Sequence, residues 1–323
     1  MRARPPGPDR PAATSTEHAP PGSGAPPTPT DPPTEPAPPT PPAPPAEPAP
    51  LVLAGTGLHY EYEGTGPALT GVDVGVGRGG LLAVLGPNGG GKTTLLRLLA
   101  GSLAPTRGSV LLDGAPVARG RRARDRLRRR VQMVFQDPDD QLFSATVGQD
   151  VSFGPLNLDL PADHVRARVD WALGALGITA LADRPTHLLS YGQRKRVVLA
   201  GAMAMLPDVL VLDEPTAGLD PAGVAELVAT LDALRARGTT LIVSTHDVDL
   251  VHGWAEHALV LDRTVLASGP AGEVLGDSDL LARARLRPAW GPLVGRVLRA
   301  HGLLPADAAD PASSEELARL LGT

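Results

Sequence analysis

The sequence predicts an α/β protein with a parallel central sheet, and two observations carry that prediction. Two strongly apolar runs, residues 209–213 (VLVLD) and 240–245 (TLIVST), flank a segment of helical character at 222–238. Unbroken runs of Val, Leu and Ile that alternate with helices are typical of parallel strands buried on both faces. A further apolar run, residues 81–85, leads through a glycine-rich loop into a helical segment. We therefore expect one large α/β domain assembled from strand, loop and helix units.

The 323 residues divide by composition into three parts. More than half of the 36 prolines lie in residues 1–50, where apolar side chains are nearly absent. Such a segment cannot offset the entropy lost on folding, so we expect a disordered proline-rich tail that is either dispensable or a docking site for a proline-recognising partner. Residues 51–270 carry the regular apolar pattern and are expected to form the α/β domain. Residues 271–323 are expected to form a small helical C-terminal region.

The composition excludes several classes of chemistry. Because the chain has no cysteine, it has no disulfide, thiolate metal site, iron–sulfur cluster or cysteine nucleophile. Aromatic residues make up only 3%, which argues against a base-stacking platform, and the net charge of -5 gives no general attraction to nucleic acid. No apolar run approaches the roughly 18 to 20 residues that span a bilayer, and no signal-peptide pattern is visible, so we expect a cytosolic protein.

The remaining elements follow in chain order. Residues 58–62 alternate between two faces, as in a strand. Short apolar runs between glycine-rich turns predict further strands at 72–76 and 108–113. A helical subdomain is expected at about 137–206. The other segments with helical character are 95–100, 118–130 and 162–206.

The loop after the apolar run at 81–85 reads GPNGGGKTT and matches the pattern G-x-x-x-x-G-K-[ST]. Glycines at these positions let backbone N–H groups turn toward phosphates, and the N-terminus of the following helix adds positive potential. Lys92 can reach the terminal phosphates, and the Thr93 hydroxyl can bind Mg²⁺. Kinases, GTPases and transport ATPases share this loop, so it predicts a P-loop NTPase site without choosing the reaction. The expected phosphate-binding residues are Gly86, Pro87, Asn88, Gly89, Gly90, Gly91, Lys92, Thr93 and Thr94.

Two adjacent carboxylates end the apolar run at 209–213. Asp213 stands at the carboxyl end of the predicted strand, where it can hold Mg²⁺ through water, and Glu214 beside it is a candidate general base. A solvated turn would also place two carboxylates in sequence. The phosphate-binding loop elsewhere in the chain favours the catalytic interpretation.

The segment LSYGQRKR, residues 189–196, would by itself be a polar helix start with Ser190 as its N-cap. With this segment the sequence resembles the ATP-binding-cassette (ABC) family over roughly residues 51–269. Ser190, Gly192 and Gln193 match the family's signature motif, usually LSGGQ, and Tyr191 replaces its first glycine.

Three more residues match motifs of that family: Gln136 in VFQDPDD, Asp220 in AGLD and His246 in STHD. The resemblance implies that two such domains pack head to tail, as a homodimer or a heterodimer, with Asp220 at the dimer contact. Each ATP would lie between the phosphate-binding loop of one chain and the signature motif of the other. Glu214 would polarise the attacking water, His246 would order the terminal phosphate, and Gln136 would report the nucleotide state. The Mg²⁺ ligands implied are Thr93, Gln136 and Asp213.

The family also places an aromatic side chain before the first strand of the parallel sheet against the adenine. Tyr60 and Tyr62 share one face of the predicted strand at 58–62, and we select Tyr62.

The branch of the family can be narrowed. The stretch VFQDPDDQLFSATVGQDVSFGPLNL, residues 134–158, is similar to the ATPase subunits of energy-coupling-factor and cobalt-type importers, as are segments between 286 and 303. This resemblance implies a peripheral ATPase on the cytoplasmic face of the membrane, with a second ATPase chain, a transmembrane coupling protein and a substrate-binding membrane subunit as partners. It would drive import of a metal ion or vitamin. The alternatives are a soluble cassette ATPase acting on nucleic acid or ribosomes, and a catalytically weak structural dimer partner.

Two surface features remain. The apolar pair Leu142 and Phe143 lies in a polar loop, so it is covered either by the coupling protein or by the domain's own helices. Eight arginines in residues 119–130 predict a solvated helix face, or one near acidic lipid headgroups, rather than a specific nucleic-acid site.

Overall fold

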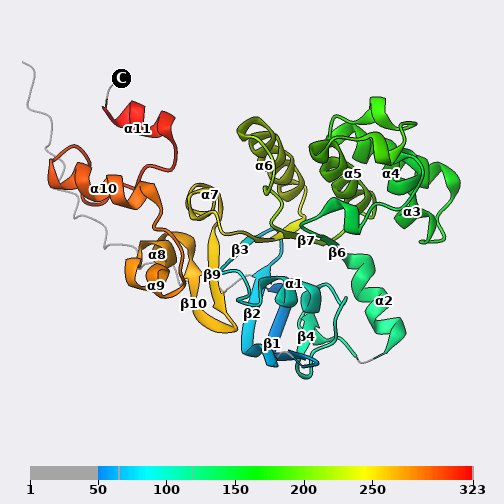
Figure 1. Cartoon of the computed structure of the whole chain (residues 1–323), viewed down its shortest axis with the longest axis horizontal. Helices are drawn as coiled ribbons and strands as arrows, with labels where there is room; N and C mark the ends of the chain where they lie inside the picture. Colours follow the sequence, from blue (N-terminus) through cyan, green and yellow to red (C-terminus); the bar gives the residue numbers. More distant parts are fainter. Residues whose placement is uncertain (1–49, 65, 119, 322–323) are drawn as a thin grey trace, which may run out of the picture. The chain divides into compact units, whose positions relative to one another are not determined.

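The computed structural model describes residues 50–64, 66–118 and 120–321. The prediction of a disordered tail at residues 1–50 therefore falls outside the described residues, apart from Pro50. Within the described ranges, helices and strands alternate along the chain. The strands form two sheets (Figure 1). The predicted α/β fold with a parallel central sheet is confirmed.

The central sheet has six strands in the order β10-β9-β3-β8-β7-β6. All neighbours pair in parallel except β10, which joins β9 as an antiparallel edge strand. The predicted strands at 81–85 and 209–213 have the expected bounds, whereas β6, β9 and β10 were not predicted because they adjoin helices or a tight hairpin and show no separate apolar run. The six strands are β3 (Leu81–Leu85), β6 (Val131–Val134), β7 (Val209–Asp213), β8 (Thr240–Ser244), β9 (His257–Asp262) and β10 (Thr264–Pro270).

A second sheet is antiparallel and has the order β2-β1-β4-β5. Its first strand is longer than the alternating segment predicts, and register shifts interrupt its pairing with β2. Helix α1 (Lys92–Leu99) lies between the two sheets, since its leucines share one hydrophobic cluster with residues of both. The strands are β1 (Leu51–Tyr62), β2 (Gly66–Gly77), β4 (Arg107–Leu112) and β5 (Ala115–Pro116).

The central sheet is buried on both faces, as its unbroken apolar strands predict. In β7, Val209 and Val211 contribute to the cluster around α1, whereas Leu210 and Leu212 contribute to the cluster under the helical subdomain. Side chains of a strand alternate between faces, so each strand supplies both cores.

Three helices form the predicted helical subdomain beside β6 and β7: α3 (Val147–Leu156), α4 (Ala162–Ala175) and α5 (Tyr191–Ala204), shown in green in Figure 1. The Thr146 side chain caps α3, and Ser190 caps α5. A short 3-10 turn at Pro138–Asp140 precedes α3, and two more, at Thr179–Leu181 and Thr186–Leu188, lie between α4 and α5. Helix α6 (Pro221–Ala236) follows β7.

The arginine-rich segment forms α2 (Arg121–Arg130), which buries Leu127 and leaves most of its arginines exposed. Arg130, at its C-terminal end, forms ion pairs with Asp113 and Asp208.

The C-terminal part of the chain is helical. Helices α8 (Ala271–Gly276) and α9 (Ser278–Arg283) share a hydrophobic cluster with α7 (Val248–Trp254), β3 and β9. Helices α10 (Trp290–Ala300) and α11 (Ser314–Leu321) follow. Among the described residues, no helix has the length and apolar character that crossing a membrane requires.

Parallel strands end at the same edge of a sheet, and ligands of open α/β sheets bind at that edge. Strands β3, β7 and β8 end at Leu85, Asp213 and Ser244. The loop that follows each of these strands therefore contributes to one site.

Candidate active site

The phosphate-binding loop joins β3 to α1 and requires glycine at both ends. A Cβ at Gly86 would lie 2.0 Å from the Leu261 carbonyl oxygen, and one at Gly91 would lie 2.7 Å from the Ala68 carbonyl oxygen. Both glycines also have positive φ, 152° and 95°. The loop is thus closely held by β2 and β9, and its backbone takes a conformation that other residues rarely adopt.

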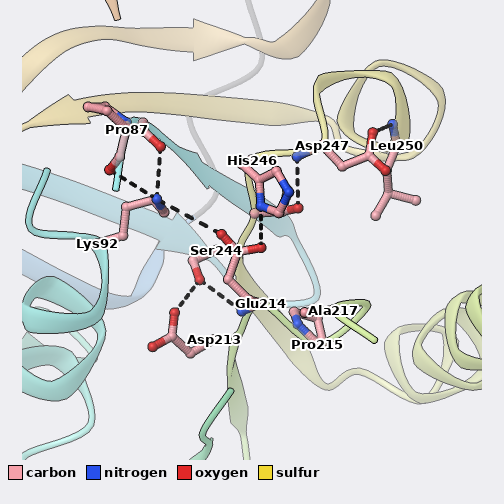
Figure 2. Close-up of polar contacts among 12 residues, drawn as sticks. Pro87, Lys92, Asp213, Glu214, Pro215, Ala217, Ser244, His246, Asp247 and Leu250 are labelled. Carbon is pink, nitrogen blue, oxygen red and sulfur yellow. Dashed lines mark hydrogen bonds and ion pairs between the residues drawn. The ribbon is translucent and has the colours of Figure 1, made fainter. Parts of the chain in front are cut away.

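Lys92 is the first residue of α1, and its side chain turns back over the loop. Its Nζ donates to the carbonyl oxygens of Gly86 at 2.8 Å and Pro87 at 3.2 Å, and it lies 3.9 Å from Glu214 Oε1 (Figure 2). Burial lowers the pKa of Lys92, while the carboxylates of Glu214 and Asp213 oppose that shift. A buried cation beside this loop is placed to meet the terminal phosphates of a nucleotide.

Asp213 is 3% exposed and is held from two sides. Thr93 Oγ1 donates to its Oδ2 at 2.7 Å, and Ser244 Oγ donates to its Oδ1 at 2.5 Å. The pairing of Asp213 with Ser244 across β7 and β8 produces the second contact. Sequence reasoning missed Ser244, because only the register of two strands brings it to the carboxylate.

Glu214 follows β7 with φ 46°, a value that non-glycine residues adopt rarely. Its backbone N–H donates to Ser244 Oγ at 3.0 Å, and its Oε2 lies 2.9 Å from His246 Nδ1. The Glu214 carboxylate is almost fully buried, whereas the His246 ring is largely exposed. Such backbone strain is found at functional sites, where the surrounding contacts maintain it.

One pocket contains most of the nucleotide-site residues that the sequence predicts from within this chain, although Gly86, Gly90 and His246 do not line it. Its lining includes Tyr62, Lys92, Thr93, Gln136 and Asp213, together with Glu214 and most of the phosphate-binding loop. Thr93, Gln136 and Asp213 present oxygen atoms, which are the ligands that Mg²⁺ prefers. The described residues contain no group of three or more His, Asp or Glu that could hold a metal. The donor set therefore fits a hard cation whose remaining ligands are phosphate oxygens and water.

Tyr62 and Arg263 also line this pocket, together with residues 66–68. The Tyr62 hydroxyl is 3.3 Å from Thr94 Oγ1, and its ring packs edge to face on Tyr60 with centroids 4.9 Å apart. Arg263, in the turn between β9 and β10, has φ 60°, and its N–H donates to the Gly90 carbonyl at 2.8 Å. Sequence reasoning missed Arg263, because nothing in its local pattern marks it.

The signature residues lie outside this pocket. At the start of α5, Gln193 N–H donates to Ser190 Oγ at 3.3 Å and Ser190 N–H donates to Gln193 Oε1 at 3.0 Å, which forms a capping box. Neither these two residues nor Gly192 lines the pocket with Lys92. Asp220 caps α6 by accepting a hydrogen bond from Gly223 N–H at 2.7 Å.

Comparisons with known proteins agree with this site. Residues 69–217 match the family model for ABC transporters. The cobalt import ATP-binding protein CbiO of Rhodobacter capsulatus is 53% identical over 244 residues, which cover 75% of this chain and 86% of the relative. The energy-coupling factor transporter ATP-binding protein EcfA of Methanocaldococcus jannaschii is 45% identical over 231 residues, 71% of this chain and 83% of the relative.

A solved structure agrees as well. CbiO1 from Clostridium perfringens, described as part of the ABC transporter complex CbiONQ, has 43% sequence identity and a TM-score of 0.66. The match covers 77% of this chain and 99% of that protein. The resemblance inferred from the signature and phosphate-binding motifs is thereby confirmed. The chain belongs to the ABC transporter family, as an ATP-binding and ATP-hydrolysing subunit in the branch of the cobalt-import and energy-coupling-factor proteins.

Proposed function

We propose that this chain is the ATP-hydrolysing motor of a membrane importer for a metal ion or vitamin and works on the cytoplasmic face of the cell membrane. The observation that carries the proposal is the position of Glu214, which lines the pocket beside the phosphate-binding loop and lies near Lys92 Nζ through one oxygen and His246 Nδ1 through the other. Relatives named for cobalt import and for energy coupling support this substrate class.

In this proposal, Glu214 is the group that polarises the attacking water. Its carboxylate is buried, and its two oxygens lie near different partners, Lys92 Nζ on one side and His246 Nδ1 on the other. One oxygen is thus oriented by the imidazole while the other faces the lysine that neutralises phosphate charge. Phosphoryl transfer depends mainly on such positioning and charge stabilisation. His246 is sufficiently exposed to contact the terminal phosphate as well.

The cofactor in this proposal is Mg²⁺, held by Thr93, Gln136 and Asp213. When bound, it would supply positive charge that neutralises phosphate oxygens. Within the chain, Ser244 fixes the rotamer of Asp213 by a hydrogen bond to Oδ1, which leaves Oδ2 directed at Thr93. The carboxylate is therefore oriented by the protein itself.

The second half of the ATP site comes, in this proposal, from another ATPase chain, either identical or related. Ser190, Gly192 and Gln193 lie at the N-terminus of α5, outside the pocket of their own chain. A helix N-terminus favours anions because its first N–H groups point outward. Head-to-tail pairing would apply this terminus to the phosphates held by the partner, with Asp220 at the contact between the chains. Tyr62 would stack on the adenine at the other end of the pocket.

The membrane partners would bind the apolar surface of the helical subdomain. Phe143 is 65% exposed and Phe153 is 52% exposed, and their rings pack edge to face with centroids 4.7 Å apart. Asp150 Oδ2 accepts hydrogen bonds from the N–H groups of Phe143 and Ser144, which holds the loop in place. Leu142, in contrast, packs on the domain's own core. The two residues of the predicted apolar pair therefore differ: Leu142 packs on the core, whereas Phe143 is exposed and available to a transmembrane coupling protein.

Replacement of Phe143 by aspartate tests this proposal. Phe143→Asp should release the chain from membranes of the producing cells and from co-purifying integral membrane proteins, while ATP hydrolysis in solution persists because Phe143 lies outside the ATP pocket. Val297→Asp, which places the same charge at an exposed apolar site on α10, serves as the control and should remain bound. Membrane association of Phe143→Asp at the wild-type level would show that Phe143 does not bind the membrane partner, and co-purification of the wild-type chain with nucleic acid would favour a soluble cassette ATPase instead.

A further inference from the structure

Tyr191 is the residue at which the signature motif departs from its usual form, and its side chain contacts its own chain. The ring lies against Gly218, where an added Cβ would meet Tyr191 Cε1 at 2.8 Å. The hydroxyl donates to the Gln136 carbonyl oxygen at 3.4 Å. A small pocket formed by Tyr191, Gln136, Thr93 and Asp213, among others, adjoins the nucleotide site. Helix α5, which begins with the signature motif, is called the signature helix below. Its residue Tyr191 therefore contacts two loops of the same chain, one at Gln136 and one at Gly218.

Lys195 lies one helical turn further along α5 and contacts the same region. Its Nζ donates to the Ala217 carbonyl at 2.5 Å and the Pro215 carbonyl at 2.9 Å, and lies 3.4 Å from the Glu214 carbonyl. It also lies 5.4 Å from the centroid of the Tyr191 ring, within the range of a cation–π contact. Lys195 is one of only two lysines in the chain, the other being Lys92.

Tyr191 and Lys195 contact the segment 214–218, which begins at Glu214, the proposed general base. It turns sharply, with Ala217 N–H donating to the Glu214 carbonyl and Leu219 N–H donating to the Thr216 carbonyl, both at 3.1 Å. Behind it, a cavity lined mostly by apolar side chains lies between α5 and α6. Lys195, Pro215 and Leu219 all line this cavity, and the hydrogen bonds of Lys195 link the segment to α5 beside it.

We propose that Tyr191 and Lys195 are positioning residues, which tie the signature helix to the segment 214–218 and to the Gln136 loop of the same chain and so hold Glu214 in its reactive conformation. Neither side chain lines the pocket that holds Lys92. Both act through the backbone of the residues that they contact. The proposal rests on the role proposed above for Glu214, which also has the strained backbone that such contacts would maintain.

The test compares four variants. Lys195→Met keeps the length of the side chain but removes the charge and its donors, and Lys195→Arg keeps the charge. Tyr191→Phe removes only the hydroxyl. Arg166→Met, at an exposed position on α4 of the same subdomain, is the matched control for the loss of a basic side chain.

Hydrogen–deuterium exchange of the nucleotide-free protein provides the first measurement. Lys195→Met should speed exchange at the amides of Ala217 and Leu219, Lys195→Arg should be intermediate, and Arg166→Met should match wild type. Hydrogen–deuterium exchange does not depend on ATP turnover. It therefore tests the positioning role separately from the role proposed for Glu214 in catalysis. Wild-type exchange in Lys195→Met would overturn the proposal.

Steady-state hydrolysis provides the second measurement. Removal of a positioning residue should lower kcat and leave KM for ATP nearly unchanged, so we expect Lys195→Met to lose about 10-fold in kcat with KM within about threefold. Tyr191→Phe should lose about threefold in kcat. If Lys195→Met does not fold, Tyr191→Phe still tests the positioning role. Unchanged kcat in both variants, or a fall in ATP affinity as large as the fall in kcat, would contradict a positioning role.

Discussion

His246 Nδ1 lies 2.9 Å from Glu214 Oε2, although the two residues come from loops that follow different strands. The contact joins a buried carboxylate to a largely exposed imidazole. It is possible because β7 and β8 are neighbours in the parallel sheet and end at the same edge. In the proposed function, Glu214 polarises the attacking water and His246 contacts the terminal phosphate, so Glu214 is the first residue to test.

Glu214→Gln should nearly abolish ATP turnover while ATP binding is retained. The amide cannot accept a proton from water, and a positioned general base contributes roughly 100- to 10,000-fold to a rate. Steady-state hydrolysis and binding of a fluorescent ATP analogue measure the two effects, and the variant should also accumulate as an ATP-bound dimer. Glu226→Gln, at an exposed ion pair with Arg196, is the control for the same chemical change. Turnover close to wild type in Glu214→Gln would remove Glu214 from this role.

Ser244→Ala should reduce both stability and hydrolysis. The Ser244 hydroxyl donates to Asp213 and accepts from Glu214 N–H, and the site is fully buried. Glu214 N–H keeps its bond to the Ser244 carbonyl oxygen, but loss of the hydroxyl leaves the buried Asp213 Oδ1 without its donor, which costs about 1 to 3 kcal/mol of the free energy of unfolding. Urea denaturation and steady-state hydrolysis are the measurements. Ser152→Ala removes a hydroxyl that bonds within α3, away from the site, and should leave hydrolysis unchanged. Equal activity of the two variants would show that Ser244 does not orient Asp213.

Lys195 should make the stability of the protein depend on pH above neutrality. Burial lowers the pKa of Lys195 from 10.5 to about 8, although Glu214 and Asp137 oppose that shift. Between these two values the unfolded chain keeps a proton that the folded chain has lost, so the contribution of Lys195 to the free energy of unfolding rises with pH. Below about pH 8 both states hold the proton, and the folded state bears the full cost of burying the charge.

Urea denaturation of wild type and Lys195→Met between pH 7 and pH 10 checks this prediction. The wild-type free energy of unfolding should increase relative to that of Lys195→Met as pH rises. The difference between wild type and Arg166→Met should stay constant, because the Arg166 side chain is exposed. A constant difference for Lys195→Met would mean that the pKa of Lys195 is not lowered by folding.

Local sequence patterns were sufficient for three strands of the central sheet, β3, β7 and β8, and for the phosphate-binding loop. The apolar runs at 81–85 and 209–213 specify β3 and β7 because unbroken Val and Leu segments of this length are stable when both faces are buried. The phosphate-binding loop could be identified because glycine is required where a Cβ would collide with the backbone of another strand, as at Gly86. Lys92, Asp213 and Glu214 were selected from their own motifs, whereas His246 was assigned to the site through the resemblance to the ABC family.

The remaining features depend on contacts between segments that are distant in sequence. Ser244 becomes part of the site because the register of β7 and β8 sets it opposite Asp213. Arg263 reaches the nucleotide pocket because β10 turns back beside β9. Leu142 and Phe143 look alike in sequence, yet one packs on the core and the other is exposed, because adjacent side chains of a loop point in different directions. The contacts of Tyr191 likewise depend on segments that are distant in sequence. Its substitution into the signature motif is visible in the sequence, but its contacts with Gln136 and Gly218 arise only when α5 packs beside the end of β7.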